Sequence, residues 1–235
     1  MTDTDYAIQV ENLLFHWRKG VPILDLPTLT IKRGERVFIK GASGSGKSTL
    51  LSLIGGVLLP QAGSITVLGT KFNDLSGAKR DAFRAEHIGI IFQMFNLIPY
   101  LPVLDNVLLP CRFSRKRKRH VEAHSNSLKS EAKRLLDHLD LPMEMLQRPV
   151  TELSVGQQQR VAAARALIGA PELVIADEPT SALDADRRTG FLQLLLNECA
   201  DKNTTLIFVS HDSALETQFD RSIHLSEVNQ AVNGA

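Results

Sequence analysis

Residues 41–49 read GASGSGKST, and this stretch together with its flanks decides the fold. It fits the pattern G-x-x-x-x-G-K-[ST] through Gly41, Gly46, Lys47 and Ser48. The run ERVFIK (35–40) before it predicts a strand, and KSTLLSLIGGVL (47–58) after it predicts a helix, which is the context in which this pattern binds nucleotide phosphates. A glycine-rich turn without a ligand is the alternative, and the flanking strand and helix argue against it.

Each part of the loop has a chemical role. Glycine lets the backbone approach phosphate closely, and the N–H groups of a helix N-terminus supply positive potential. Lys47 is suited to reach the β- and γ-phosphates, and the Ser48 hydroxyl is suited to ligate Mg²⁺. We expect the nucleotide to contact Gly41, Ala42, Ser43, Gly44, Ser45, Gly46, Lys47, Ser48 and Thr49.

Strands and helices alternate along the rest of the core. Predicted strands are AIQVENLLF (7–15), LTIK and ERVFIKG on either side of a KRGE turn (29–41), HIGIIFQ (87–93), ELVIAD (172–177) and TTLIFVS (204–210). Predicted helices include QQQRVAAARALIG (157–169) and RTGFLQLLLNECA (188–200). This alternation predicts an α/β fold with a parallel sheet covered on both faces.

Residues 94–156 differ from the rest of the chain in their sequence pattern, which predicts a helical insertion. Prolines interrupt the segment, and LKSEAKRLLDHLDLP (128–142) places Leu128, Ala132, Leu135, Leu136 and Leu139 on one helical face. The segment SRKRKRH (114–120) contains five consecutive basic residues, for which we favour a solvated loop. Contact with anionic lipid headgroups is the alternative. His120 and His124 are four residues apart, but without further ligands we do not expect a metal site.

Two carboxylates follow an apolar run in LVIADEPTSALD (173–184). A buried strand delivers Asp177 and Glu178 to the carboxyl edge of the sheet, where open α/β sheets bind ligands. Asp177 is suited to hold Mg²⁺, and Glu178 is suited to polarise a water against the γ-phosphate. By itself the pair reads as an acidic end of a strand, but beside a phosphate loop the catalytic interpretation is favoured.

Two further strands end in residues that fit the same edge. His211 follows LIFVS, and we interpret it as a γ-phosphate contact although a lone histidine is more often structural. Gln93 ends IGIIFQ, where it is suited to orient the water and Mg²⁺.

Together these motifs resemble those of an ABC-type ATPase subunit, in the family's order and over nearly the whole chain. Gly41 to Thr49 match the Walker A loop, Leu173 to Glu178 the Walker B strand, and Gln93 the Q-loop. The signature, the D-loop and the switch histidine match Leu153 to Gln157, Ser181 to Asp184, and His211. Trp17 occupies the place of an aromatic that stacks on adenine, with core packing as the alternative.

The resemblance implies a fold and a mechanism. The fold is a P-loop α/β core (1–93 and 157–235) with N-terminal antiparallel strands and a helical subdomain (94–156), all in one ATPase domain. Two subunits, identical or related, pair head to tail around two ATP molecules with Mg²⁺. Each ATP lies between the Walker motifs of one chain and the signature of the other, so that Ser154, Gly156, Gln157 and Asp184 join the site.

The segment IIFQMFNLIPYLPVLDNVLLP (90–110) resembles the lipoprotein-release and macrolide-export group, whose partners are FtsX-like permeases and, indirectly, a periplasmic adaptor. FNLIPYLPVLDNV (95–107) would then help to receive a cytoplasmic helix of the permease. The expected location is the cytoplasmic face of the inner membrane, peripheral through the permease. The alternative function is a regulatory ATPase of the cell-division type, which transmits a conformational change without moving a substrate.

The signature reads LSVGQ, with Val155 where the family usually has glycine. Ser154 and Gln157 have the S-x-x-Q spacing of a capping box, so a helix should begin here. Its N-terminal N–H groups would then face the γ-phosphate held by the other subunit. We expect Val155 to be the first helical residue with its side chain pointing away, and Gly156 to be the position that needs no Cβ.

Composition excludes several other classes. The net charge of +1 gives no general attraction to nucleic acid, and ATPases that act on DNA or ribosomes usually carry long coiled coils or two cassettes. Cys111 and Cys199 form neither a disulfide framework nor a zinc pattern, which predicts a reducing cytosol. MTDTDYAIQV (1–10) lacks the features of a secretory signal, and no apolar run approaches the roughly 18 residues of a spanning helix.

Overall fold

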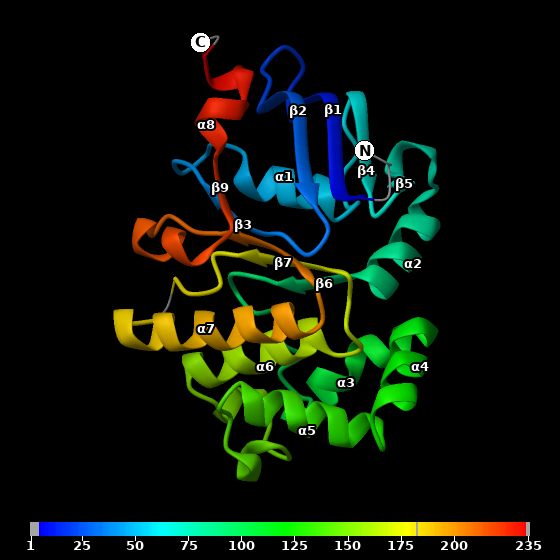
Figure 1. Cartoon of the computed structure of the whole chain (residues 1–235), viewed down its shortest axis with the longest axis vertical. Helices are drawn as coiled ribbons and strands as arrows, with labels where there is room; N and C mark the ends of the chain where they lie inside the picture. The colour runs from blue at the N-terminus through cyan, green and yellow to red at the C-terminus, as the bar shows by residue number, and fades with distance from the viewer. Residues whose placement is uncertain (1–4, 182, 234–235) are drawn as a thin grey trace. The chain divides into compact units, whose positions relative to one another are not determined.

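The computed structural model describes residues 5–181 and 183–233 (Figure 1). The first four residues of the N-terminal stretch and Ala182 of the predicted D-loop therefore lie outside the described residues. The chain divides into two compact units, Met1–Arg84 with Thr205–Ala235, and Ala85–Thr204. Helix α2 (Gly77–His87) contains the boundary between them. Within the described ranges, no helix combines the length and the hydrophobicity needed to cross a bilayer.

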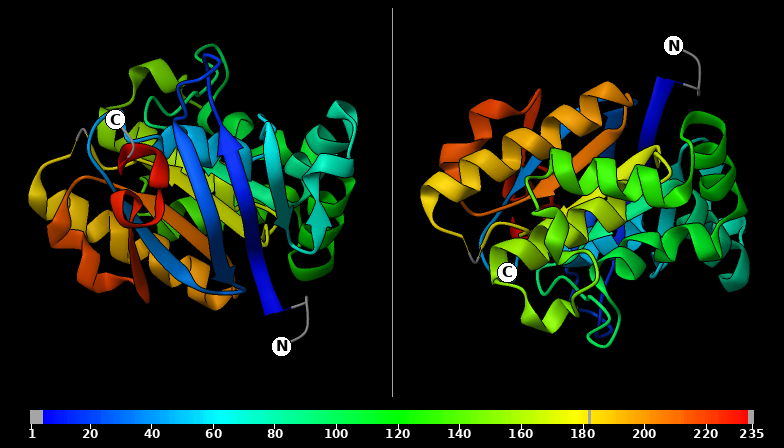
Figure 2. Two further views of the ribbon diagram at one scale, coloured as in Figure 1. Left: turned by 90° about the horizontal axis from the view of Figure 1, so that it is seen from above. Right: turned by 90° about the horizontal axis from the view of Figure 1, so that it is seen from below.

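The first unit contains an antiparallel sheet with the strand order β2-β1-β4-β5, seen from above in Figure 2. Its strands are Leu24–Lys32, Tyr6–Phe15, Ala62–Val67 and Thr70–Lys71 respectively. In β1, Ile8 and Val10 are buried whereas Glu11 is exposed, as the partial alternation in the sequence predicts. The antiparallel N-terminal strands implied by the family resemblance are thus confirmed.

The first unit also contains parallel strands. Strand β3 (Arg36–Lys40) pairs in parallel with β8 (Thr205–Val209) on one side and with β9 (Arg221–His224) on the other. Phe38 of β3 and Phe208 of β8 stack with ring centroids 6.2 Å apart, and Phe219 packs against both. Helix α1 (Lys47–Ile54) follows β3, and α8 (Leu225–Val228) follows β9. The short 3₁₀ helices are Phe72–Asp74, Ser213–Gln218 and Gln230–Asn233.

The second unit is built on the parallel pair β6 (Ile88–Ile91) and β7 (Leu173–Asp177), both largely buried. Its helices are α3 (Val103–Phe113), α4 (Arg115–His124), α5 (Leu128–His138), α6 (Val155–Leu167) and α7 (Ala185–Asp201), with 3₁₀ turns at Met143–Met145 and Val150–Glu152. Helix α3 packs against α5 and α6. Of the apolar face predicted for 128–142, Leu128 is only partly buried, and the other four residues are buried.

The basic run 114–120 is helical rather than a loop, so the predicted conformation was wrong, although its arginines and lysines other than Arg117 are solvent-exposed as expected. It forms the cap and first half of α4, where the Ser114 hydroxyl accepts the Arg117 backbone N–H at 3.1 Å. The Arg117 guanidinium is buried and donates to the carbonyls of Ala166, Ile168 and Ile88. Burial lowers its pKa to about 10. The carbonyls at the end of α6 have no N–H donors within the helix, and the Arg117 guanidinium supplies donors to them.

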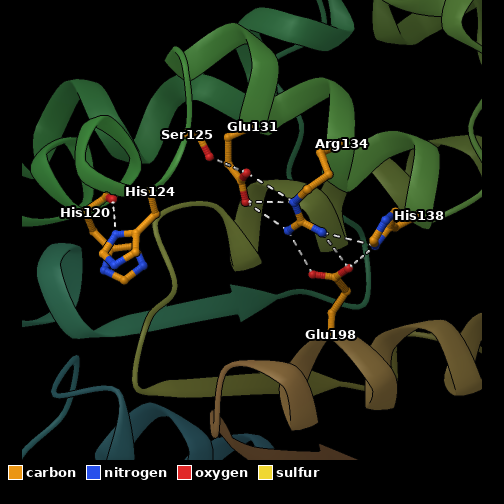
Figure 3. Close-up of polar contacts among 7 residues, drawn as sticks. All are labelled: His120, His124, Ser125, Glu131, Arg134, His138 and Glu198. Atoms are coloured by element: carbon orange, nitrogen blue, oxygen red, sulfur yellow. Dashed lines mark hydrogen bonds and ion pairs between the residues drawn. The ribbon is translucent and has the colours of Figure 1, made fainter.

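A second buried charge joins α5 to α7 (Figure 3). The Glu198 carboxylate on α7 accepts hydrogen bonds from Arg134 at 3.0 and 3.1 Å, and His138 Nδ1 lies 2.6 Å from it. Glu131 also accepts from Arg134. Burial alone would raise the pKa of Glu198, but the hydrogen bonds from Arg134 and His138 hold it below its ordinary value of 4.5. The network therefore stabilises the second unit at neutral pH.

We expect Glu198→Gln to lower the free energy of unfolding by about 2 kcal/mol, because the change breaks a buried ion pair. The loss is limited because Arg134 keeps its second ion-pair partner, Glu131. Urea denaturation at pH 7 measures this loss. Glu122→Gln is the matched control, since the Glu122–Lys118 pair is 51% exposed on both sides and should matter by no more than about 0.5 kcal/mol.

The pH dependence of this loss has a definite sign. Because the folded-state pKa of Glu198 is depressed, its stabilisation is complete above pH 4.5 and declines as the pH falls below that value. The difference in the free energy of unfolding between the wild-type chain and Glu198→Gln should therefore shrink as the pH falls below 4.5. Equal losses for the two glutamine variants at neutral pH would contradict a stabilising network.

Candidate functional site

The phosphate loop lies between β3 and α1, as the sequence predicts. Gly44 and Gly46 have positive φ angles of 78° and 96°, and Gly46 caps α1. Such angles suit glycine, and they leave the first-turn N–H groups of α1 without intrahelical acceptors. No acidic residue stands in that first turn, and Ser48 is exposed there. The arrangement is a cradle of backbone donors open to an anion.

Lys47 lies folded over this cradle. Its ammonium donates to the carbonyls of Gly41 at 2.8 Å and Ala42 at 2.9 Å. The Ser45 hydroxyl is buried and has no hydrogen-bond partner among the described residues. A buried polar atom without a partner costs free energy, so a ligand that hydrogen-bonds to this hydroxyl would be favoured at the loop.

Trp17 lies in the turn between β1 and β2 and is 64% exposed, so the core-packing alternative is wrong. Its ring packs edge-to-face on Phe15 with centroids 5.1 Å apart. The turn leads into Leu24, and a Cβ built on Gly46 would lie only 2.9 Å from the Leu24 side chain. The start of β2 is therefore next to the phosphate loop, within the same unit.

His211 follows β8 and is exposed. Strand β8 is parallel to β3, with Val209 opposite Ile39. Because the two strands run in the same direction, His211 leaves the sheet at the edge where the loop beginning at Gly41 also leaves it. The first unit thus brings the phosphate loop, the turn with Trp17 and His211 into one region.

The second unit brings a second set of predicted residues to one sheet edge. Strands β6 and β7 are parallel with Ile91 opposite Ala176, so Gln93 and the pair Asp177-Glu178 emerge at the same end. Gln93 is exposed, whereas Asp177 and Glu178 are partly buried.

Glu178 has a φ angle of +44°. This left-handed conformation is uncommon for a residue with a side chain and typical of functional sites. Nothing in the sequence signals it.

The stretch LSVGQ forms the predicted capping box at the start of α6. The Ser154 hydroxyl accepts the Gln157 N–H at 3.3 Å, and the Ser154 N–H donates to Gln157 Oε1 at 2.9 Å. Val155 is the first helical residue and is 47% exposed, as expected. A Cβ built on Gly156 would meet only Leu183, at an ordinary contact of 3.5 Å. The chain itself therefore leaves room at residue 156.

Asp184 caps α7, and its carboxylate accepts the Arg187 N–H at 3.0 Å. Since the carboxylate already has this structural role, a contact with nucleotide stays a prediction.

Arg165 of α6 is a residue that sequence reasoning missed. Its guanidinium donates to the carbonyls of Phe95 and Asn96, which follow Gln93 and have positive φ angles of 59° and 49°. The helix that begins with the signature therefore holds the segment after Gln93 directly. Only the tertiary structure reveals this link, because an arginine in a helical run carries no signal of its partner.

Comparisons with known proteins agree with these features. The sequence profile of the ABC transporter family matches residues 24–181. The lipoprotein-releasing system ATP-binding protein LolD of Hydrogenovibrio crunogenus is 37% identical over 95% of both chains. LolD of Bordetella avium is 36% identical over 96% of this chain and 97% of its own.

A solved structure is also similar. The ATP-binding cassette MJ0796, in a dimeric post-hydrolysis state bound to ADP and Pi, has a TM-score of 0.83 and 34% identity over 95% of both chains.

Proposed function

This chain belongs to the ABC transporter family as an ATP-binding, ATP-hydrolysing subunit of the LolD-like group, and from that premise we propose that it powers an FtsX-like permease of the lipoprotein-release type. The observation that carries the proposal is the likeness to LolD proteins over nearly the full length of both chains. The permease would place the subunit at the cytoplasmic face of the inner membrane, with a periplasmic adaptor as an indirect partner.

Within this proposal the two sets of site residues act on one nucleotide. The phosphate loop holds the phosphates, Trp17 stacks on adenine, and His211 contacts the γ-phosphate. The unpartnered Ser45 hydroxyl supports a phosphate ligand. The oxygen donors Ser48, Gln93 and Asp177 suit Mg²⁺, which prefers hard oxygen ligands and would neutralise phosphate charge.

The remaining residues belong to catalysis and to the dimer. Glu178 is the general base for the attacking water, and its constrained backbone supports that role. Ser154, Gly156, Gln157 and Asp184 serve the ATP of the partner subunit. The dimeric state of the related cassette supports the pairing of two subunits, which we propose to be head to tail.

The helical subdomain proposed for 94–156 carries the permease contact. Phe92, Met94 and Tyr100 are exposed large apolar side chains around Gln93. Exposed apolar groups gathered in one segment favour an interface. Arg165 connects this segment to α6 by hydrogen bonds. A displacement of the segment at the permease contact would therefore be transmitted to the signature at the start of α6.

The signature gives a paired prediction. Gly156→Val should lower the ATPase rate about 10²-fold, since displacing a reacting group by about 1 Å costs that much, whereas exposed Val155→Gly should stay within about two-fold. Phosphate release measures both rates, and melting temperatures check folding, which the space around Gly156 predicts to be intact. If both variants hydrolyse ATP at the same rate, the proposed turn geometry is wrong.

Reconstitution tests the function as a whole. Membrane proteins that co-purify with the chain are identified first, an FtsX-like permease found among them is combined with the chain in lipid vesicles, and ATP-dependent release of a membrane-anchored lipoprotein is measured. ATP-dependent release supports transport. Hydrolysis that the permease stimulates without release would favour the regulatory function instead. Failure to co-purify with any membrane protein would contradict both.

A further inference from the structure

Helix α4 presents a cationic face outward. Arg115, Lys118 and Arg119 are exposed and follow the spacing of one helical face, while Arg117 and Val121 lie on the buried face. Three carbonyls hold the Arg117 guanidinium in the interior of the second unit. This anchor fixes the rotation of the helix about its own axis, so the three exposed cations face away from the unit.

The fold does little to neutralise these cations. Arg115 and Arg119 lie one helical turn apart, and neither has a hydrogen-bond or ion-pair partner among the described residues. Lys118 has only Glu122 at 3.7 Å, and both side chains are 51% exposed. Like charges at this spacing destabilise a helix, and exposed pairs contribute little. The cations therefore bring no evident stability to the chain.

An exposed aromatic residue directly precedes this helix in the chain. Phe113 ends α3, directly before the Ser114 cap of α4, and is 78% exposed. A phenyl ring next to arginines and a lysine is the composition of surfaces that bind the membrane interface. There the ring enters the boundary between headgroups and acyl chains, and the guanidinium groups pair with lipid phosphates.

We propose that Phe113 together with Arg115, Lys118 and Arg119 forms a docking surface for an anionic lipid bilayer. Charge complementarity selects anionic headgroups, and the apolar ring of Phe113 is suited to enter the interface of a bilayer. This contact is additional to any permease contact and does not depend on one. Its role would be to hold the subunit against the membrane surface while the dimer opens and closes.

Vesicle sedimentation with the full chain tests the proposal without a permease. The probes are vesicles of phosphatidylcholine alone, and vesicles of phosphatidylglycerol and phosphatidylcholine in equal parts. We expect binding to the mixed vesicles only, and its loss in high salt, where the screening length falls to about 3 Å. Equal binding to both vesicle types would overturn the proposal.

Variants locate the surface. Arg115→Gln with Arg119→Gln should lower the partition coefficient about 25-fold, since each basic residue near an anionic surface contributes a factor of about five. Phe113→Ser should lower it about tenfold through lost apolar burial. Lys71→Gln with Lys79→Gln removes the same charge from exposed positions in the first unit and should leave binding unchanged.

Melting temperature and lipid-free ATPase rate should match the wild-type chain in every variant, because none of these residues belongs to the site or the core. Wild-type partitioning of the arginine variant, or an equal loss in the lysine control, would overturn the proposal. The proposal would also be overturned if the arginine or phenylalanine variants bound vesicles normally but no longer co-purified with a permease. That result would assign this face to a protein partner.

Discussion

Replacing Glu178 by Gln is expected to lower ATP hydrolysis by about 10²- to 10⁴-fold, the contribution of a positioned general base, while ATP binding is retained. Glutamine keeps the shape of glutamate but cannot accept the proton from the attacking water. Because ATP persists, the closed dimer should accumulate. Phosphate release measures the rate, and size-exclusion chromatography with ATP and Mg²⁺ measures the dimer.

The control for this variant is Glu144→Gln, which makes the same change at an exposed position in the 3₁₀ turn Met143–Met145. It should hydrolyse ATP at the wild-type rate and form no stable dimer. Glutamine at residue 178 inherits the left-handed backbone, so a difference between the variants reports chemistry rather than relieved strain. Near-normal turnover in Glu178→Gln would remove Glu178 as the base.

Replacing Lys47 by Ala is expected to weaken ATP binding and to lower turnover by about 10²- to 10³-fold, which is the effect of removing one preorganised hydrogen-bond donor. In the structure its ammonium bonds to the carbonyls of Gly41 and Ala42, and we propose that bound phosphates replace these acceptors. The backbone cradle remains in the variant, so some affinity should survive.

Equilibrium dialysis with ATP measures the affinity of Lys47→Ala, and phosphate release measures its turnover. Trp17 is the one tryptophan of the chain, so its fluorescence reports separately on the proposed adenine contact. Lys79→Ala, at an exposed position on α2, is the control and should match the wild-type chain. Unaltered kinetics in Lys47→Ala would contradict the role of the loop.

Much of the candidate site is local in sequence, and those parts were predictable. A strand, a glycine loop and a helix around residues 35–54 need only neighbouring residues to form, and the S-x-x-Q spacing of Ser154 and Gln157 closes a capping box within one turn. The parallel strands followed from buried apolar runs that alternate with helices. The sequence by itself therefore determined the α/β architecture and the order of the motifs.

The tertiary structure decided which of two physically reasonable environments a residue occupies. Arg117 reads as one more solvated cation, yet carbonyls from Ile88, Ala166 and Ile168 draw it into the interior. Arg165 meets Phe95 and Asn96 for the same reason. These carbonyls lie far away along the chain, and whether a buried charge is satisfied depends on partners that only folding brings together.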